Sequence, residues 1–171
     1  MSRVKNGDLW QAVLDTAHFE YLRAGRARIR RTSGQAKQTA KGVVFTGKGL
    51  PDYVGAFRAG DRPVMFVADA KATLESKMYF SQLDDHQAQD LEGFRDMGAL
   101  TGLLVRLGRQ EMFLPWGTIR DDYYAGAKVV PTAKGITFSK GYWLDQVLLW
   151  LDGAELAHLY MMSPPLDLEE S

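Results

Sequence analysis

The chain contains no cysteine among its 171 residues. This absence excludes disulfide bonds and zinc sites built from thiolates, and it is typical of proteins in a reducing cytoplasm. No apolar run follows the basic residues at the N-terminus, so we expect no signal peptide. The longest strongly apolar stretch, 142–151, is interrupted by Asp145 and is too short to span a bilayer. We therefore expect a cytoplasmic protein with no membrane segment, located in the host cytoplasm if a phage encodes it.

Two long segments each lack charged residues of one sign. Residues 21–50 contain eight Lys and Arg and no acidic residue, whereas residues 141–171 contain six Asp and Glu and no Lys or Arg. The formal net charge of +0 hides this asymmetry. An unbroken cationic segment is the electrostatic footprint of phosphate binding, which favours a nucleic-acid partner. The alternative is an ordinary solvated face that the acidic end partly neutralises.

The order of hydrophobic patterns predicts a single α/β domain over residues 1–171. Its expected core is a central mixed β-sheet flanked by helices. Apolar spacing predicts helices at 7–24, 83–97, 115–125 and 142–159, and strands at 26–31, 52–57, 63–70, 102–107 and 111–114. Residues 128–138 are expected to be irregular or strand-like. A basic arm or extended hairpin is expected at about 33–48, and an acidic tail at about 163–171.

Two aspartates and a lysine stand at the ends of two predicted strands that a tight turn connects. Asp52 begins one strand, and Asp69 and Lys71 end the next. Because residues two apart in a strand point to the same face, Asp69 and Lys71 project together. Carboxylates can hold Mg²⁺, and a lysine beside them can orient a water or stabilise charge on a phosphate. Taken alone, these three residues fit a surface ion pair better than they fit a phosphodiesterase site.

Three short motifs in this order extend the pattern. They are Gly-Leu-Pro-Asp-Tyr-Val-Gly at 49–55, Val-Ala-Asp-Ala-Lys-Ala-Thr at 67–73 and Asp-His-Gln at 85–87. Together they resemble the RecU-type Holliday-junction resolvases of the PD-(D/E)-x-K nuclease superfamily, over roughly residues 5–115. The resemblance implies a restriction-endonuclease-like core and a Mg²⁺-dependent endonuclease. It also implies that a homodimer resolves four-way DNA junctions by paired nicks.

The resemblance assigns roles to the matching residues. Asp52 and Asp69 would bind Mg²⁺, or Mn²⁺ as a substitute, together with the backbone carbonyl of Ala70. Lys71 would position the attacking water. Gln87 would close the site from a helix. The family often has glutamate at the position of Asp69, a mild change because both side chains supply oxygen ligands.

The first helix departs from the family pattern. Such nucleases commonly supply a glutamate from this helix, and the matching position here is Gln11. A neutral amide can hold a metal-bound water but adds no charge, which argues against a second tightly bound metal ion. His86 lies beside Gln87, and the three histidines are isolated from one another in the sequence, so a zinc site is not indicated.

The basic segment is expected to contact DNA. In the resembled family a stalk at this position enters the central opening of the junction, and 33–48 occupies its place here. The basic residues that we expect to bind DNA are Arg28, Arg30, Arg31, Lys37, Lys41, Lys48 and Lys77. For Lys37, Lys41 and Lys48 the alternative is ordinary loop charge.

Two other functions compete with a junction resolvase. One is a less selective nuclease of the same fold that acts on DNA ends or flaps. The other is a catalytically silent DNA-binding module, against which the complete set of Asp52, Asp69 and Lys71 argues. In the last predicted helix, Trp143, Val147, Trp150 and Leu151 recur at helical spacing. They are typical core residues, with a dimer interface as the second interpretation.

Overall fold

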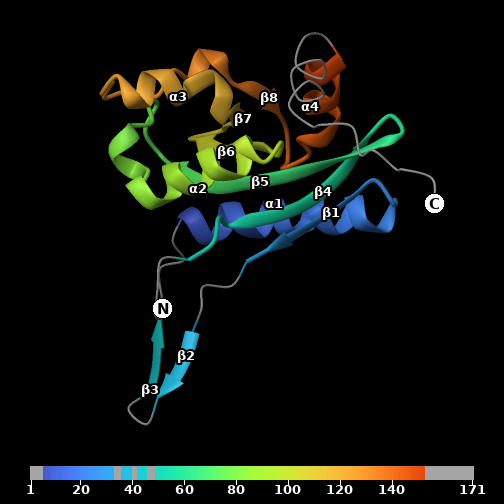
Figure 1. Cartoon of the computed structure of the whole chain (residues 1–171), viewed down its shortest axis with the longest axis horizontal. Helices are drawn as coiled ribbons and strands as arrows, with labels where there is room; N and C mark the ends of the chain where they lie inside the picture. The colour runs from blue at the N-terminus through green and yellow to red at the C-terminus, as the bar shows by residue number, and fades with distance from the viewer. Residues whose placement is uncertain (1–5, 33–35, 40–41, 46–48, 153–171) are drawn as a thin grey trace, which may run out of the picture.

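The structure is a computed structural model that describes residues 6–32, 36–39, 42–45 and 49–152 (Figure 1). A six-stranded sheet in the order β1-β4-β5-β6-β7-β8 forms its centre. The strands are β1 (Ala27–Arg31), β4 (Tyr53–Ala59), β5 (Arg62–Thr73), β6 (Leu100–Leu107), β7 (Gln110–Pro115) and β8 (Ile136–Phe138). Neighbours run antiparallel, except that β5 and β6 run parallel. The predicted α/β class with a mixed sheet is therefore confirmed.

Helices cover the sheet on two sides. The helices are α1 (Asn6–Arg23), α2 (Asp85–Asp96), α3 (Trp116–Tyr124) and α4 (Leu144–Trp150), with short 3-10 turns η1 (Phe80–Gln82) and η2 (Thr132–Lys134). The even-numbered residues Phe66 and Ala68 of β5 pack in one core cluster with Trp10 of α1 and Trp143. Val67 points the other way and packs with Leu91 of α2 and Trp116 of α3. This alternation places Asp69 and Lys71 on the α2 side of β5.

The boundaries follow the predicted patterns closely at the N-terminal half. Gly25, with a φ of 68°, stops α1, and Gly98, with a φ of 90°, follows α2. Both glycines accept a left-handed backbone that other residues adopt at a cost, so each ends its helix. The region 128–138, left open by the sequence, contains η2 and the short strand β8.

The C-terminal helix is shorter within the described residues than predicted. A helix was expected over 142–159, whereas α4 covers Leu144–Trp150, and residues from 153 onward, with the acidic tail, lie outside the described part. Trp143, Val147 and Leu151 are fully buried inside the chain. The core interpretation of this apolar stripe is thus confirmed. No helix in the described residues is long and apolar enough to cross a membrane.

A second, two-stranded sheet occupies part of the predicted arm. It consists of β2 (Ala36–Thr39) and β3 (Gly42–Phe45), paired antiparallel with Lys37 opposite Val44. Figure 1 draws it apart from the main sheet, between the ends of β1 and β4. This agrees with the hairpin alternative for the arm.

The β1–β4 contact depends on a glycine. In its register Ile29 faces Gly55, and a Cβ built on Gly55 would lie 1.9 Å from the backbone oxygen of Arg28. A backbone oxygen cannot rotate away as a flexible side chain can. Gly55 therefore permits the close approach that sets the position of β1 next to β4.

Candidate active site

Asp52 and Asp69 are locked to each other across the β4–β5 hairpin. The backbone N–H of Asp52 donates to Oδ1 of Asp69 at 3.1 Å, and the backbone N–H of Ala70 donates to Oδ2 of Asp52 at 2.8 Å. Thr32 extends the β1 pairing by donating its N–H to the carbonyl of Asp52 at 2.8 Å. Each carboxylate is thereby oriented by the backbone of the other strand. The two predicted acids are brought together as the hairpin pattern indicated.

Asp69 is buried with one oxygen unsatisfied. Asp69 is only 1% exposed, and its Oδ2 atom has no hydrogen-bond partner. Burial, and then the nearby negative charge of Asp52, raise the pKa of Asp69 from 3.8 to about 6. A buried carboxylate oxygen without a donor is costly for the folded state, and a cation beside it would remove that cost. The environment of Asp69 therefore fits a divalent metal ion.

The oxygen atoms around the two aspartates suit a hard cation. Within a strand, the N–H and C=O of one residue face the same neighbour. The carbonyl of Ala70 therefore faces the Asp52 side, where its N–H is already bonded. In the described residues no group of three or more His, Cys, Asp or Glu side chains is placed to hold a metal. Mg²⁺ needs only one or two carboxylates because it keeps several waters. Two aspartates and a carbonyl are thus a sufficient set.

Lys71 is held beside this pair by the second helix. Its Nζ donates to Oε1 of Gln87 at 2.8 Å, and the same oxygen accepts the backbone N–H of Asp84 at 3.1 Å. Asp84 precedes the first turn of α2, so Gln87 caps the helix start while it fixes the lysine. The predicted proximity of Lys71 and Gln87 is therefore present. His86 is half-buried, and no hydrogen bond or ion pair joins it to the described site residues.

No protein-family model matches the sequence, and no curated protein shows significant similarity to it. Among solved structures, the chain is similar to Hjc, a Holliday junction resolvase from the archaeal hyperthermophile Archaeoglobus fulgidus. The two share 17% sequence identity and a TM-score of 0.45. The match covers 78% of this chain and 91% of Hjc. Because the identity is this low, the roles of the residues have to be derived from the site itself.

Gln11 is not joined to the aspartates by any hydrogen bond among the described residues. Its backbone carbonyl accepts the hydroxyl of Tyr53 at 3.1 Å. The same hydroxyl donates to Oδ1 of Asp15 at 2.8 Å, and Arg31 pairs with Oδ2 of Asp15 at 3.3 Å. Tyr53 is fully buried and follows Asp52 directly. These contacts anchor the start of β4 to α1, and sequence reasoning missed them.

A third acid, Asp90, was also missed. It lies on α2 three residues after Gln87, hence on the same side of the helix. Its charge adds to the causes that raise the pKa of Asp69. The helical spacing of Gln87 and Asp90 was the signal available in the sequence.

The predicted DNA-binding arginines divide between the two faces of β1. Arg28 and Arg30 are exposed, whereas Ala27 and Ile29 are buried against α1. Arg31 has the same orientation as Ile29, which explains its pairing with Asp15 on the α1 side. Neither Arg28 nor Arg30 forms an ion pair with a described carboxylate. The two arginines are thus available to an external anion.

The register places Arg28 and Arg30 on the same face as the aspartates. Arg30 pairs with Val54, and Val54 pairs with Val67, which is two residues before Asp69 in β5. Arg28, Ala56 and Met65 form the next row, and Met65 is 47% exposed. Successive rows on one face are about 7 Å apart. A line of cations therefore leads away from the carboxylate pair.

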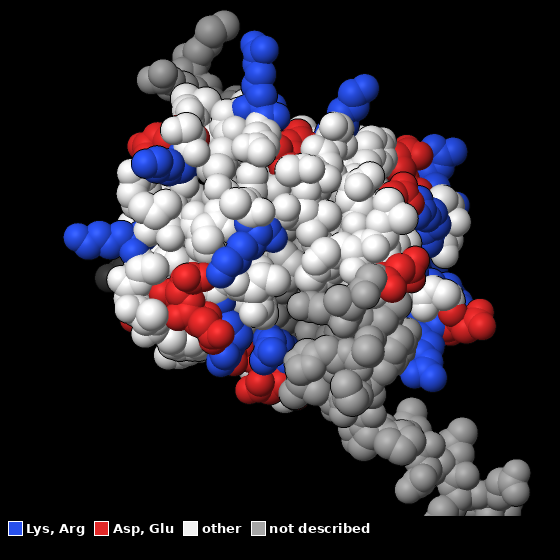
Figure 2. Space-filling model, turned by 90° about the horizontal axis from the view of Figure 1, so that it is seen from above, with Lys and Arg blue, Asp and Glu red and all other residues white. Residues whose placement is uncertain are grey.

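The remaining predicted basic residues are less informative. Lys77 is exposed in the loop between β5 and η1. Lys37 lies in β2, and Lys41 and Lys48 lie outside the described residues. Figure 2 shows the upper face of the molecule, where the coloured cations are dispersed among neutral and acidic residues. The described cations are not gathered on that face.

Proposed function

We propose that this chain is a metal-dependent endonuclease that cuts branched DNA. One observation carries the proposal. Asp52, directly before β4, and Asp69, within β5 rather than at its end as predicted, are interlocked, and a buried oxygen of Asp69 lacks any donor. A mixed sheet with helices on two sides is also the arrangement that the resemblance to the RecU family implied. Mg²⁺ is the proposed ion, with Mn²⁺ as a substitute.

The residues divide the chemistry among them. When bound, the metal ion would supply a Lewis acid for a phosphate oxygen and lower the pKa of the attacking water. Asp69 would hold it through Oδ2, together with Asp52 and the carbonyl of Ala70. The ammonium group of Lys71, directed by Gln87, would orient the water or stabilise charge on the phosphate. Tyr53 and Asp15 keep the backbone at Asp52 in place.

DNA is the proposed substrate because of the cations beside the acids. Arg28 and Arg30 stand on the same face as Asp69, and a phosphate backbone meeting them would continue toward the carboxylate pair. Such contacts position a nucleic acid without reading its sequence. Selectivity for a junction would then come from shape and from two identical sites in a homodimer, related by a two-fold axis.

A synthetic four-way junction tests the function. With Mg²⁺, the chain should nick opposed strands of the junction and leave a linear duplex of the same sequence largely uncut. Removing the metal ion with a chelator should stop cleavage, and light scattering should give twice the mass of one chain. Equal cutting of junction and duplex would support the less selective nuclease. Binding of the junction without Mg²⁺- or Mn²⁺-dependent cutting would support a silent module.

Arg28 and Arg30 lead to a prediction about how DNA affinity depends on salt. Replacing Arg28 and Arg30 together by alanine should lower junction affinity and reduce the slope of log affinity against log salt by about two, because about one unit accompanies each lost phosphate contact. Arg31→Ala is the matched control, since Arg31 lies in the same strand but faces Asp15 on the other side. Anisotropy measured without Mg²⁺ gives both slopes. Equal slopes for the double variant and the wild type would show that these two arginines do not contact DNA phosphates.

A further inference from the structure

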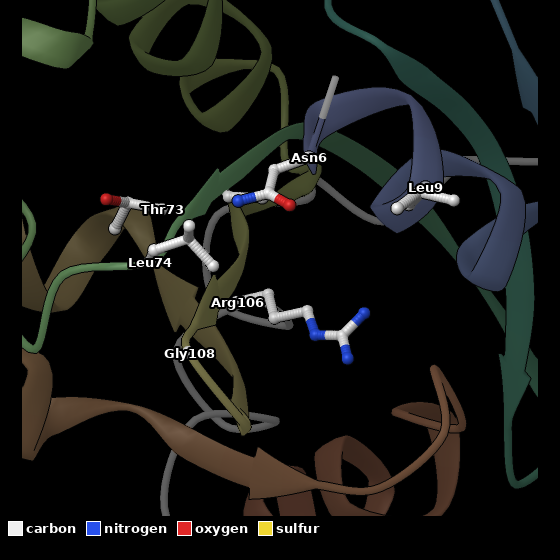
Figure 3. Close-up of a pocket in the computed structure, with 7 residues that line it drawn as sticks. Asn6, Leu9, Thr73, Leu74, Arg106 and Gly108 are labelled. Carbon is white, nitrogen blue, oxygen red and sulfur yellow. The ribbon is translucent and has the colours of Figure 1, made fainter. Parts of the chain in front are cut away.

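A small cavity lies on the opposite side of β5 from the aspartates. Its volume is about 140 Å³, and it is bordered by Asn6, Leu9, Thr73, Leu74, Arg106 and Gly108 (Figure 3). Since one water occupies about 30 Å³ of liquid, the cavity could hold a few waters or one phosphate-sized group. Its walls are largely apolar, and no carboxylate is among the described residues that line it. We call it the Arg106 pocket.

Arg106 is the charged group of this pocket. Figure 3 shows its side chain extending from β6 into the open space, with Leu9 and Asn6 of α1 on one side and Leu74 on the other. The guanidinium lies 6.0 Å from the centre of the Trp10 ring, and Trp10 is fully buried. Packing against the indole therefore helps to fix the direction of the guanidinium.

No described carboxylate forms an ion pair with this guanidinium. Its cross-strand neighbour Glu111 is buried and accepts the backbone N–H of Gly141 instead. Arg106 forms no ion pair with a described carboxylate, although other arginines of the chain do, among them Arg26 and Arg120. The residue is half-buried. A partly desolvated cation without a direct ion pair lowers stability, and an anion entering the pocket would offset that cost. A guanidinium offers paired N–H donors that match the oxygens of a phosphate.

The pocket lies at the same end of the sheet as the acids. In the β5–β6 register Arg106 pairs with Ala72, the residue that follows Lys71. Alternation along the strand directs Lys71 to the α2 side and Ala72 to the α1 side. A DNA strand passing the C-terminal end of β5 could therefore meet the carboxylate pair on one side and Arg106 on the other.

We propose that the Arg106 pocket binds a backbone phosphate of the DNA whose cleavage is proposed above. The inference rests on that proposed function. The same chemistry could also bind free phosphate, which has the same oxygens. A phosphate of the DNA backbone is favoured over free phosphate because Ala72, the partner of Arg106, directly follows Lys71 in β5. Binding there would hold the DNA strand on the face of the sheet opposite to Arg28 and Arg30.

Two charge changes test the pocket by junction binding in the absence of Mg²⁺. Arg106→Ala should weaken binding several-fold and reduce the log–log salt slope by about one. Leu74→Asp, at a position that is 80% exposed, should act in the same way by placing a carboxylate at the rim without removing the Arg106–Trp10 contact. The matched controls are Arg109→Ala, in the exposed β6–β7 turn, and Met97→Asp, at a position that is also 80% exposed. Both controls should keep the wild-type slope.

The Nε–H resonance of Arg106 separates the two phosphate sources. Junction DNA should shift this resonance in an NMR titration, whereas inorganic phosphate at the same phosphate concentration should leave it nearly unchanged. A shift with inorganic phosphate alone would overturn the DNA assignment. Wild-type slopes for Arg106→Ala and Leu74→Asp would overturn the pocket. If these variants bind normally and the wild type still cuts the junction, only the phosphate-binding role of the pocket is rejected. If the wild type neither binds nor cuts the junction, the proposed function itself is rejected.

Discussion

Asp69→Asn should lower Mg²⁺-dependent cleavage at least about 1000-fold and leave junction binding nearly unchanged. The carboxylate serves the metal ion, whose contribution of several kcal/mol corresponds to this factor. Affinity for DNA comes from phosphate contacts elsewhere. Cleavage and gel-shift assays on one preparation measure the two effects. Asp61→Asn, in the exposed β4–β5 turn, is the matched control and should cut at the wild-type rate.

The same substitution should raise the stability of the metal-free protein. The pKa of Asp69 is higher in the folded chain, about 6, than its ordinary value of 3.8. The folded state therefore binds the proton more tightly, and stability falls as the pH rises from about 4 to about 6. Asparagine cannot ionise, so Asp69→Asn should gain about 3 kcal/mol at pH 7 and little at pH 4. Urea unfolding at both pH values measures this. A variant less stable than the wild type at pH 7 would contradict the unsatisfied environment of Asp69.

Gly55→Ala should destabilise the fold by about 3 kcal/mol or more, because the new methyl group overlaps the backbone oxygen of Arg28. Relief requires β1 to move away from β4, which also displaces Arg28 and Arg30. Thermal and urea unfolding report the loss, and junction affinity should fall with it.

A second glycine provides the control. Gly93 lies within α2, and a Cβ there would meet nothing within 4 Å. Gly93→Ala should therefore stabilise the protein by about 1 kcal/mol, since alanine favours a helix over glycine. If both alanine variants have the same stability, the close β1–β4 approach is wrong.

The convergence of Asp52, Asp69 and Lys71 could be predicted from local patterns. A tight turn at 59–61 joins two strands, and their alternating apolar residues restrict which faces can be buried. The hairpin alone then brings Asp52 near Asp69. The helix after the second strand could be expected to carry Gln87 back over the same face, as the 85–87 motif suggested.

Contacts between distant segments could not be predicted in this way. Asp15 and Tyr53 are 38 positions apart, and their hydrogen bond depends on how α1 crosses the sheet. The separation of Arg31 from Arg28 and Arg30 was available from strand alternation alone, yet all three were assigned to DNA together. The last predicted helix, 142–159, starts two residues too early, because α4 begins at Leu144; its predicted end lies outside the described residues.

Metal binding to the isolated protein tests the central claim most directly, because it requires neither DNA nor cleavage. Titration with Mn²⁺, followed by the loss of the free-ion signal in electron paramagnetic resonance, counts the bound ions. The wild type and Asp61→Asn should each bind one ion per chain, and excess Mg²⁺ should displace it. Asp52→Asn and Asp69→Asn should lose this site. Unchanged Mn²⁺ binding in both of these variants would show that the two aspartates are not the metal centre.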